Sequence, residues 1–197
     1  MACRLLKPQL ASAYVNSSDS TLYLDLRWPD EAVVLAGAPR KTVLILRPQA
    51  LSGAVDLHYS VLTLNKTATR LPEAMFASIA RCNSWQLSKL DTTFDAGRDV
   101  QAGGARHNHV LNSNQSATCS AGKGDNTPSL TLHASSSRLV NVQCDNAPPS
   151  PFPTPMAGPD DCASTTVHLH LWNQIWNTNY QMWIDGDLQH GGLLTLQ

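Results

Sequence analysis

The sequence predicts an all-β fold, an antiparallel β-sandwich of two packed sheets joined by long loops. Segments in which polar and apolar residues alternate recur roughly every 10–20 residues, and this alternation is the period of a strand with one buried face. Charged residues make up only 15% of the 197 residues, against about 25% in a typical soluble domain. Uncharged polar residues replace them, as expected for turns and outer sheet faces rather than exposed helices. Many strands without helical periodicity indicate a sandwich.

The most regular alternation lies in the first third of the chain. Thr21–Trp28 places leucines on one side and mainly polar side chains on the other. Pro29 is expected to end this strand, because proline cannot donate to a sheet ladder. Lys41–Arg47 is a nearly continuous apolar run closed by Pro48, and Val55–Leu64 alternates again. We therefore expect three strands here.

Further strands are expected along the rest of the chain. Leu71–Ile79 has a possible helix start at Pro72, but its alternation favours a strand. The other segments share a clear alternation and are, in chain order, Trp85–Leu90, Ser129–His133, Arg138–Gln143, Thr165–Trp172 and Gly192–Leu196.

We expect a single domain spanning residues 1–197, of which residues 1–19 are poorly defined by the pattern. Asn112–Pro128 is rich in Asn, Ser and Gly and predicts a flexible surface loop. Residues 145–162 form a Pro-rich loop with six prolines, which should run as extended polyproline. Because this loop joins two segments that resemble core strands, we interpret it as a long connection within one domain.

Charge and hydropathy exclude several classes of partner. The formal net charge is −1 and no run of Lys or Arg occurs, so no nucleic acid is expected to bind. No apolar run approaches the roughly 20 residues that cross a membrane, so no membrane partner is expected. Residues Met1–Pro8 lack the apolar core of a signal peptide. No cofactor is expected either.

The cysteines do not have the spacing of a metal site. Because their number is odd, at least one stays free or pairs with another chain. A disulfide across the Pro-rich loop and free thiols throughout are both compatible with the sequence. The five residues are Cys3, Cys82, Cys119, Cys144 and Cys162, and the disulfide considered is Cys144–Cys162.

Three N-glycosylation sequons favour, weakly, a secreted or secretory-pathway protein. An Asn-x-Ser/Thr sequence is the acceptor motif for N-linked glycans, although it also arises by chance in a chain rich in Ser and Thr. The three sequons begin at Asn16, Asn65 and Asn114.

Histidine pairs and aromatic residues each allow two interpretations. His107 and His109, or His168 and His170, could chelate a metal from one face of a strand. We favour no metal site, with His168 and His170 on the polar face of a strand whose other face enters the core. The aromatic group near the C-terminus could stack on sugars or pack in the core. It consists of Trp172, Trp176, Tyr180 and Trp183, and for Trp172 and Trp183 we favour the core.

Four segments resemble an uncharacterised family related to glycoside hydrolase family 38, the α-mannosidase type. More narrowly, they are similar to the C-terminal β-sandwich region of that family. The segments are Trp28–Val33, Gly37–Arg40, Leu64–Ala74 and Leu171–Trp183, and the resemblance covers roughly residues 20–110 and 165–190. The chain departs from the family where Asn177 replaces a Gly and Gln181 replaces a Pro, and its final strand, from Ile184 on, lacks the expected aromatic and Arg residues.

The resemblance implies a non-catalytic C-terminal domain or fragment of a glycoside-hydrolase-like protein. Its partner would be an N-terminal α/β catalytic-type domain that holds the catalytic aspartate and the metal ligands, and a saccharide would be a second partner. The residues implied in contacts to carbohydrate or to the other domain are Arg70, Glu73, His107, Asn173 and Asn179. Arg70 and Glu73 could instead hold their loop together through a charge-assisted hydrogen bond. The alternative functions are a free-standing carbohydrate-binding (lectin-like) module and a non-functional truncated product.

We expect the chain alone to be inactive on aryl glycosides, because no acid–nucleophile pair or metal constellation is recognisable. Trp172→Ala and Trp183→Ala are each expected to cost about 3–5 kcal/mol if both rings lie in the core. A domain with about 5–15 kcal/mol of stability would then be barely folded.

Overall fold

The computed structural model describes residues 4–95, 99, 108–119, 129–133, 136, 139–144, 165–174 and 183–197. In this part of the chain thirteen strands, paired only in antiparallel fashion, accompany one short helix, so the all-β prediction is confirmed. The elements are β1 (Gln9–Val15), β2 (Leu22–Arg27), α1 (Asp30–Ala36), β3 (Lys41–Leu51), β4 (Ala54–Lys66), β5 (Ala74–Cys82), β6 (Trp85–Lys89), β7 (Thr92–Asp95), β8 (Asn108–Val110), β9 (Ser116–Cys119), β10 (Leu130–His133), β11 (Leu139–Cys144), β12 (Thr165–Asn173) and β13 (Gly186–Leu196).

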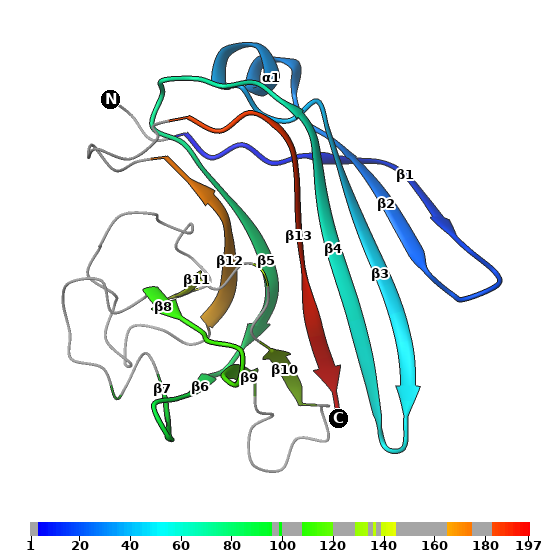
Figure 1. Ribbon diagram of the computed structural model, residues 1–197, viewed down its shortest axis with the longest axis vertical. Helices are drawn as coiled ribbons and strands as arrows, with labels where there is room; N and C mark the ends of the chain where they lie inside the picture. Colours follow the sequence, from blue (N-terminus) through cyan, green and yellow to red (C-terminus); the bar gives the residue numbers. More distant parts are fainter. Residues whose placement is uncertain are drawn as a thin grey trace.

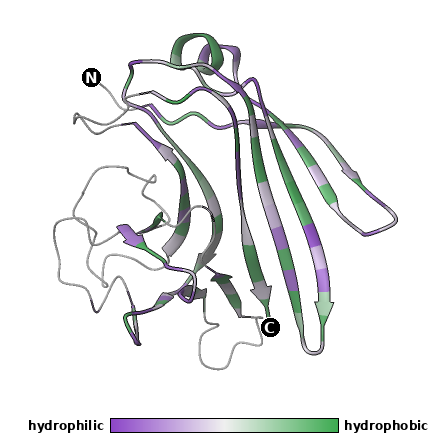
Figure 2. Ribbon diagram, in the orientation of Figure 1, coloured by the Kyte–Doolittle hydropathy of each residue, from purple (hydrophilic) through white to green (hydrophobic). Residues whose placement is uncertain are grey.

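The strands form two sheets (Figure 1). The larger has nine strands in the order β1-β2-β3-β4-β13-β10-β9-β6-β7, and the smaller has four in the order β5-β12-β11-β8. Strand β13 lies between β4 and β10, so the last strand of the chain joins the N-terminal strands to the middle ones. Figure 2 shows hydrophobic and hydrophilic residues interspersed along β3 and β4, as the sequence pattern predicts.

Strand β3 continues through Pro48, which corrects the expectation that proline closes it. Strand β2 pairs with β3 only as far as Leu46, opposite Leu22. Beyond Leu46, β3 therefore pairs on one side only with strands of the described chain, and there Pro48 lies opposite Leu57 of β4. Proline is tolerated at such an edge because no ladder hydrogen bond is lost on the open side.

Helix α1 follows Pro29, where the sequence predicted only the end of a strand. Pro29 precedes the first turn, and Asp30 and Glu31 place negative charge at the helix N-terminus. Gly37 ends the helix with φ +65°, the left-handed conformation of a C-cap. A Cβ atom at Gly37 would lie 2.4 Å from the Thr67 carbonyl oxygen, so only glycine fits there. Tertiary contact as well as capping therefore selects this residue.

The core lies between the two sheets. Strands β11 and β12 of the smaller sheet contribute Val and Leu side chains. Strands β6, β9 and β10 of the larger sheet contribute apolar side chains that face them. All are at most 1% exposed; they are Val140, Val142, Val167, Leu169, Trp85, Leu87, Ala117 and Leu132. Trp172 also belongs to this core, as predicted, but Trp183 is 44% exposed, so the core assignment of Trp183 is wrong. Trp183 lies just before β13 begins and is therefore beyond the packed region.

His168 and His170 alternate with core residues along β12, as expected, but they are buried rather than solvated. Each is only 6% exposed. The Ser78 hydroxyl and His168 Nδ1 are 2.8 Å apart. The rings of His170 and Phe76 pack edge to face, with their centroids 4.4 Å apart. Among the described residues no group of three His, Cys, Asp or Glu could hold a metal ion.

The two sheets are joined covalently by a disulfide between Cys82 and Cys119. Cys82 ends β5 of the four-stranded sheet and Cys119 ends β9 of the nine-stranded sheet, with Cα atoms 5.8 Å apart. This pairing is not the Cys144–Cys162 bond considered from the sequence, and it excludes the alternative of free thiols for Cys82 and Cys119. Cys3, Cys162 and the Pro-rich loop lie outside the described residues.

Four strands escaped prediction, and a fifth was placed too late. Strand β1 lies in the segment expected to be poorly defined, β7 and β8 lie outside every predicted strand, and β9 lies in the expected surface loop. Ala117 of β9 is fully buried between Leu87 and Leu132, so neighbouring strands, not its own sequence, order this segment. Strand β13 begins at Gly186 rather than Gly192 because it follows β4 to its end.

Replacing Cys82 and Cys119 together by Ala is expected to lower the free energy of unfolding by about 2–4 kcal/mol, because the bond restricts the unfolded chain over a separation of 37 residues. Urea unfolding checks this, with reduced wild type as the control. An unchanged midpoint would contradict it.

Trp172→Ala is expected to cost about 3–5 kcal/mol, since it leaves a cavity in the core. Trp183→Ala serves as the matched control and should change stability by about 0.5 kcal/mol or less, as surface substitutions do. Thermal unfolding of the two variants compares them. Equal effects would contradict the different environments of the two rings.

Candidate functional site

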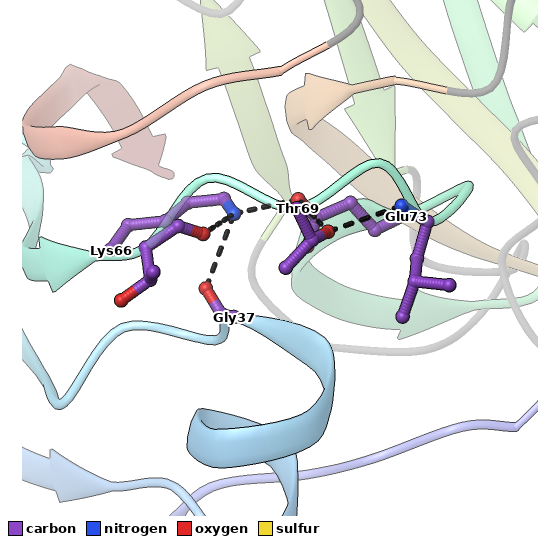
Figure 3. Close-up of polar contacts among 6 residues, drawn as sticks. Gly37, Lys66, Thr69 and Glu73 are labelled. Carbon is purple, nitrogen blue, oxygen red and sulfur yellow. Dashed lines mark hydrogen bonds and ion pairs between the residues drawn. The ribbon is translucent and has the colours of Figure 1, made fainter.

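Four segments that are distant in sequence meet at one end of the domain, beside helix α1 (Figures 1 and 3). We call this region the α1 end and define it as residues 30–37, 65–74, 173–174 and 183–187. The Asn65 N–H donates to Asp187 Oδ1 at 2.8 Å, and the Gln174 N–H donates to the Glu73 carbonyl oxygen at 2.8 Å. The first hydrogen bond joins the end of β4 to β13, and the second joins the residue after β12 to the residue before β5.

A fully buried lysine lies at the centre of the α1 end. The Lys66 side chain is 0% exposed, and its Nζ donates to Glu73 Oε1 at 2.6 Å. The same ammonium donates to the carbonyl oxygens of Gly37 at 3.2 Å and Thr67 at 3.1 Å (Figure 3). It also lies 5.4 Å from the centre of the Trp172 ring, within range of a cation–π interaction. Three acceptors match the three donors of an ammonium group.

The Glu73 carboxylate completes this arrangement from the far end of the loop. It accepts from Lys66 and from the Thr69 hydroxyl at 3.5 Å (Figure 3). With its side-chain amide oriented so that the nitrogen faces Glu73, Gln174 donates to the same oxygen at 3.0 Å and accepts from the Ile184 N–H. Burial raises the pKa of Glu73, while the hydrogen bond and charge of Lys66 oppose that rise. The carboxylate therefore depends on Lys66 to remain charged inside the protein.

The Lys66–Glu73 pair fixes the loop between β4 and β5. Both ends of the loop are anchored to the same buried contact, seven residues apart in sequence. Arg70 and Leu71 lie on the exposed part of this loop, and Leu71 is 43% exposed. Within the described residues Arg70 forms no ion pair, so the hydrogen bond considered between Arg70 and Glu73 is replaced by the one from Lys66. The chemical group that the loop presents is therefore a guanidinium.

The structure brings only some of the predicted site residues together. Asn173 ends β12 opposite Ala74, next to Glu73, and Arg70 lies on the adjoining loop. His107 and Asn179 lie outside the described residues. Sequence reasoning missed Lys66 as the partner of Glu73, because a seven-residue spacing across a loop has no regular period to reveal it.

Large apolar side chains are exposed around the same end. Val34 and Leu35 of α1 are 78% and 64% exposed, and Trp183 is 44% exposed. In α1 only Ala32 is buried, Val33 and Ala36 are half-buried, and the two largest exposed apolar side chains are those of Val34 and Leu35. No helix among the described residues is long and apolar enough to cross a membrane. The α1 end thus combines an exposed apolar helix face, an exposed arginine and an exposed tryptophan.

A double-mutant cycle tests whether Lys66 and Glu73 act as one unit. Lys66→Met and Glu73→Gln should each cost about 3–5 kcal/mol, because each leaves a buried charge without its partner. The double variant should lose much less than the sum. Arg70→Met, on the exposed loop, is the control and should be nearly neutral. Urea unfolding measures all four, and additive losses would contradict the coupling.

The comparisons with known proteins do not assign this arrangement to a family. No family model, curated protein or solved structure matches the chain.

Proposed function

We propose that this chain is the non-catalytic C-terminal β-sandwich domain of a larger glycoside-hydrolase-like protein, and that its α1 end docks against an N-terminal α/β catalytic-type domain. The observation that carries the proposal is the exposed apolar surface of the α1 end. Val34, Leu35, Leu71 and Trp183, which belong to three of the segments that define this end, are between 43% and 78% exposed. Clustered exposed apolar residues are a mark of interaction surfaces in soluble proteins.

The position of the segments that resemble the α-mannosidase-related family supports the same interpretation. Trp28–Val33 leads into α1, Leu64–Ala74 contains the loop, and Leu171–Trp183 ends beside it. Lys66 and Glu73 both come from the second of these segments, and Trp172 comes from the third. Among the described residues of the resemblance, Gly37, Lys66, Glu73 and Trp172 therefore meet around one buried contact.

Each part of the α1 end has a distinct role in this proposal. Val34 and Leu35 supply apolar area to an interface, since a helix of seven residues is too short to be stable without packing. Lys66 and Glu73 hold the loop in place, and Arg70 contacts acidic groups of the partner domain or sugar hydroxyls. Catalysis belongs to the partner domain. At the α1 end, Glu73 is paired with Lys66 and Asp187 accepts from the Asn65 N–H.

A free-standing carbohydrate-binding module is the second candidate function, and one observation favours it. Trp183 is exposed, and an exposed indole can stack on a sugar ring. Arg70 and Asn173 come from segments joined to the same buried contact and could supply hydrogen bonds to hydroxyl groups. This function requires no second domain.

The two functions are separated by testing the domain with the remainder of its parent protein. We expect this chain to co-purify with the N-terminal catalytic-type domain encoded upstream, and Val34→Asp/Leu35→Asp to abolish the complex. Leu10→Asp/Val15→Asp, at exposed positions of β1, is the matched control and should leave the complex intact.

An upstream reading frame without such a domain, or equal loss in both double variants, would overturn the docking proposal. Binding of glycans by this chain alone, lost on Trp183→Ala without a change in melting temperature, would support the carbohydrate-binding module instead.

A further inference from the structure

The β1–β2 hairpin forms the open edge of the nine-stranded sheet. Strand β1 is the first strand in the sheet order, and all seven of its residues are exposed. Its turn begins at Asn16, whose N–H donates to the Thr21 carbonyl oxygen at 2.8 Å. Ser17–Ser20 of the turn are exposed to solvent. This turn contains the first of the three sequons.

The turn holds the acceptor amide and the sequon hydroxyl together. The Ser18 hydroxyl donates to Asn16 Oδ1 at 2.9 Å, and the Ser18 N–H donates to the same oxygen at 3.1 Å. Among the described residues Asn16 Nδ2 donates to no group, so the nitrogen that would carry a glycan is available. Both residues required by the motif are thus accessible at the tip of a hairpin.

The sequon at Asn65 is built into the α1 end. The Asn65 backbone has φ +55° and is held by Asp187, and its middle residue is the buried Lys66. The carbonyl oxygen of its third residue, Thr67, accepts a hydrogen bond from Lys66. Attaching a glycan at Asn65 would require these contacts around Asn65, Lys66 and Thr67 to be broken.

The sequon at Asn114 ends inside the sheet. Its hydroxyl residue, Ser116, is the first residue of β9 and lies between Ser88 and His133 of the neighbouring strands. The side-chain Oε1 of its middle residue, Gln115, accepts a hydrogen bond from the Asn112 N–H at 2.8 Å. Only the sequon at Asn16 lies wholly in an open turn of the described chain.

The disulfide provides an independent indication of the compartment. Cys82–Cys119 joins the two sheets, and structural disulfides persist in oxidising environments such as the secretory pathway. N-linked glycans are attached to secreted proteins that pass through that compartment. The bond and the sequon are in different parts of the fold, and both indicate the same route.

We propose that Asn16 is an N-glycan acceptor and that its glycan covers the open edge of the large sheet at β1. The donor is a lipid-diphosphate-linked oligosaccharide brought by an oligosaccharyl transferase. Asn16 Nδ2 attacks the anomeric carbon, a carbon–nitrogen bond forms, and the bond from that carbon to the diphosphate oxygen breaks. The lipid diphosphate leaves with the electron pair, and Nδ2 gives up one proton.

Strand β1 has the features of an edge that needs protection. Its sequence, Gln9–Val15, contains no charged residue and no proline. Leu10, Tyr14 and Val15 are 59%, 60% and 61% exposed. Long uncharged edges pair with other chains unless something blocks them. A glycan on Asn16, the residue after Val15, would sterically block the hairpin end of this edge.

Secretion of the full chain from eukaryotic cells behind a cleavable leader tests the modification. We expect one glycan, released by peptide N-glycosidase and mapped by mass spectrometry to Asn16. Asn16→Gln and Ser18→Ala should remove it, whereas the matched controls Ser17→Ala and Ser18→Thr should retain it. Mapping of the Cys82–Cys119 bond in each secreted variant shows that the chain has folded.

An empty Asn16 in folded, secreted chain would overturn the assignment, as would a glycan at Asn65 or Asn114 instead. The shielding role has its own measurement. Enzymatic removal of the glycan should convert monomer to larger species in sedimentation velocity, and Leu10→Lys in β1 should reverse this by placing a charge on the edge. Deglycosylated protein that stays monomeric would overturn the shielding role and leave the acceptor assignment standing.

Discussion

The pairing of β13 with β4 is the constraint on which the rest of the fold depends. Strand β13 pairs with β4 from Gly186 to Leu196 and with β10 on its other side, so it joins two groups of strands into one sheet. The partners are more than a hundred residues apart in the chain, so their pairing forms only after a large loss of chain entropy. Gly191 permits the close approach, since a Cβ there would lie 3.1 Å from the Tyr59 carbonyl oxygen.

This pairing also assembles the α1 end. It brings Asp187 to the Asn65 N–H and leads Ile184 toward Gln174, which in turn contacts Glu73. Burying Lys66 and Glu73 costs desolvation energy, and their mutual contact offsets that cost only with good geometry and additional hydrogen bonds. In return, the Lys66–Glu73 contact holds the loop between β4 and β5 in one conformation. A rigid loop flanked by exposed apolar residues suits docking, because little conformational entropy is lost on binding.

The disulfide and the β1–β2 hairpin lie at two places where a large open sheet is weakly held: its contact with the second sheet and its exposed edge. Two sheets of unequal size share a limited interface, and Cys82–Cys119 links them where β5 leaves one sheet and β9 lies in the other. The exposed edge at β1 lies at the opposite side of the sheet order from β7. Structural disulfides such as Cys82–Cys119 persist in oxidising compartments, and the glycan that we propose at Asn16 would be added in the same secretory route.

The sequence by itself determined the fold class and the strands with a strong period. Val55–Leu64 alternates because one face of β4 packs inward, and this pattern is local. Only the tertiary structure decided the rest. Ala117 is ordered by the strands beside it, Trp183 is exposed because it precedes the paired region, and Glu73 takes Lys66 rather than Arg70 as its partner. A one-dimensional pattern records which side chains favour burial, whereas the segment that covers each of them depends on pairing between strands distant in the chain.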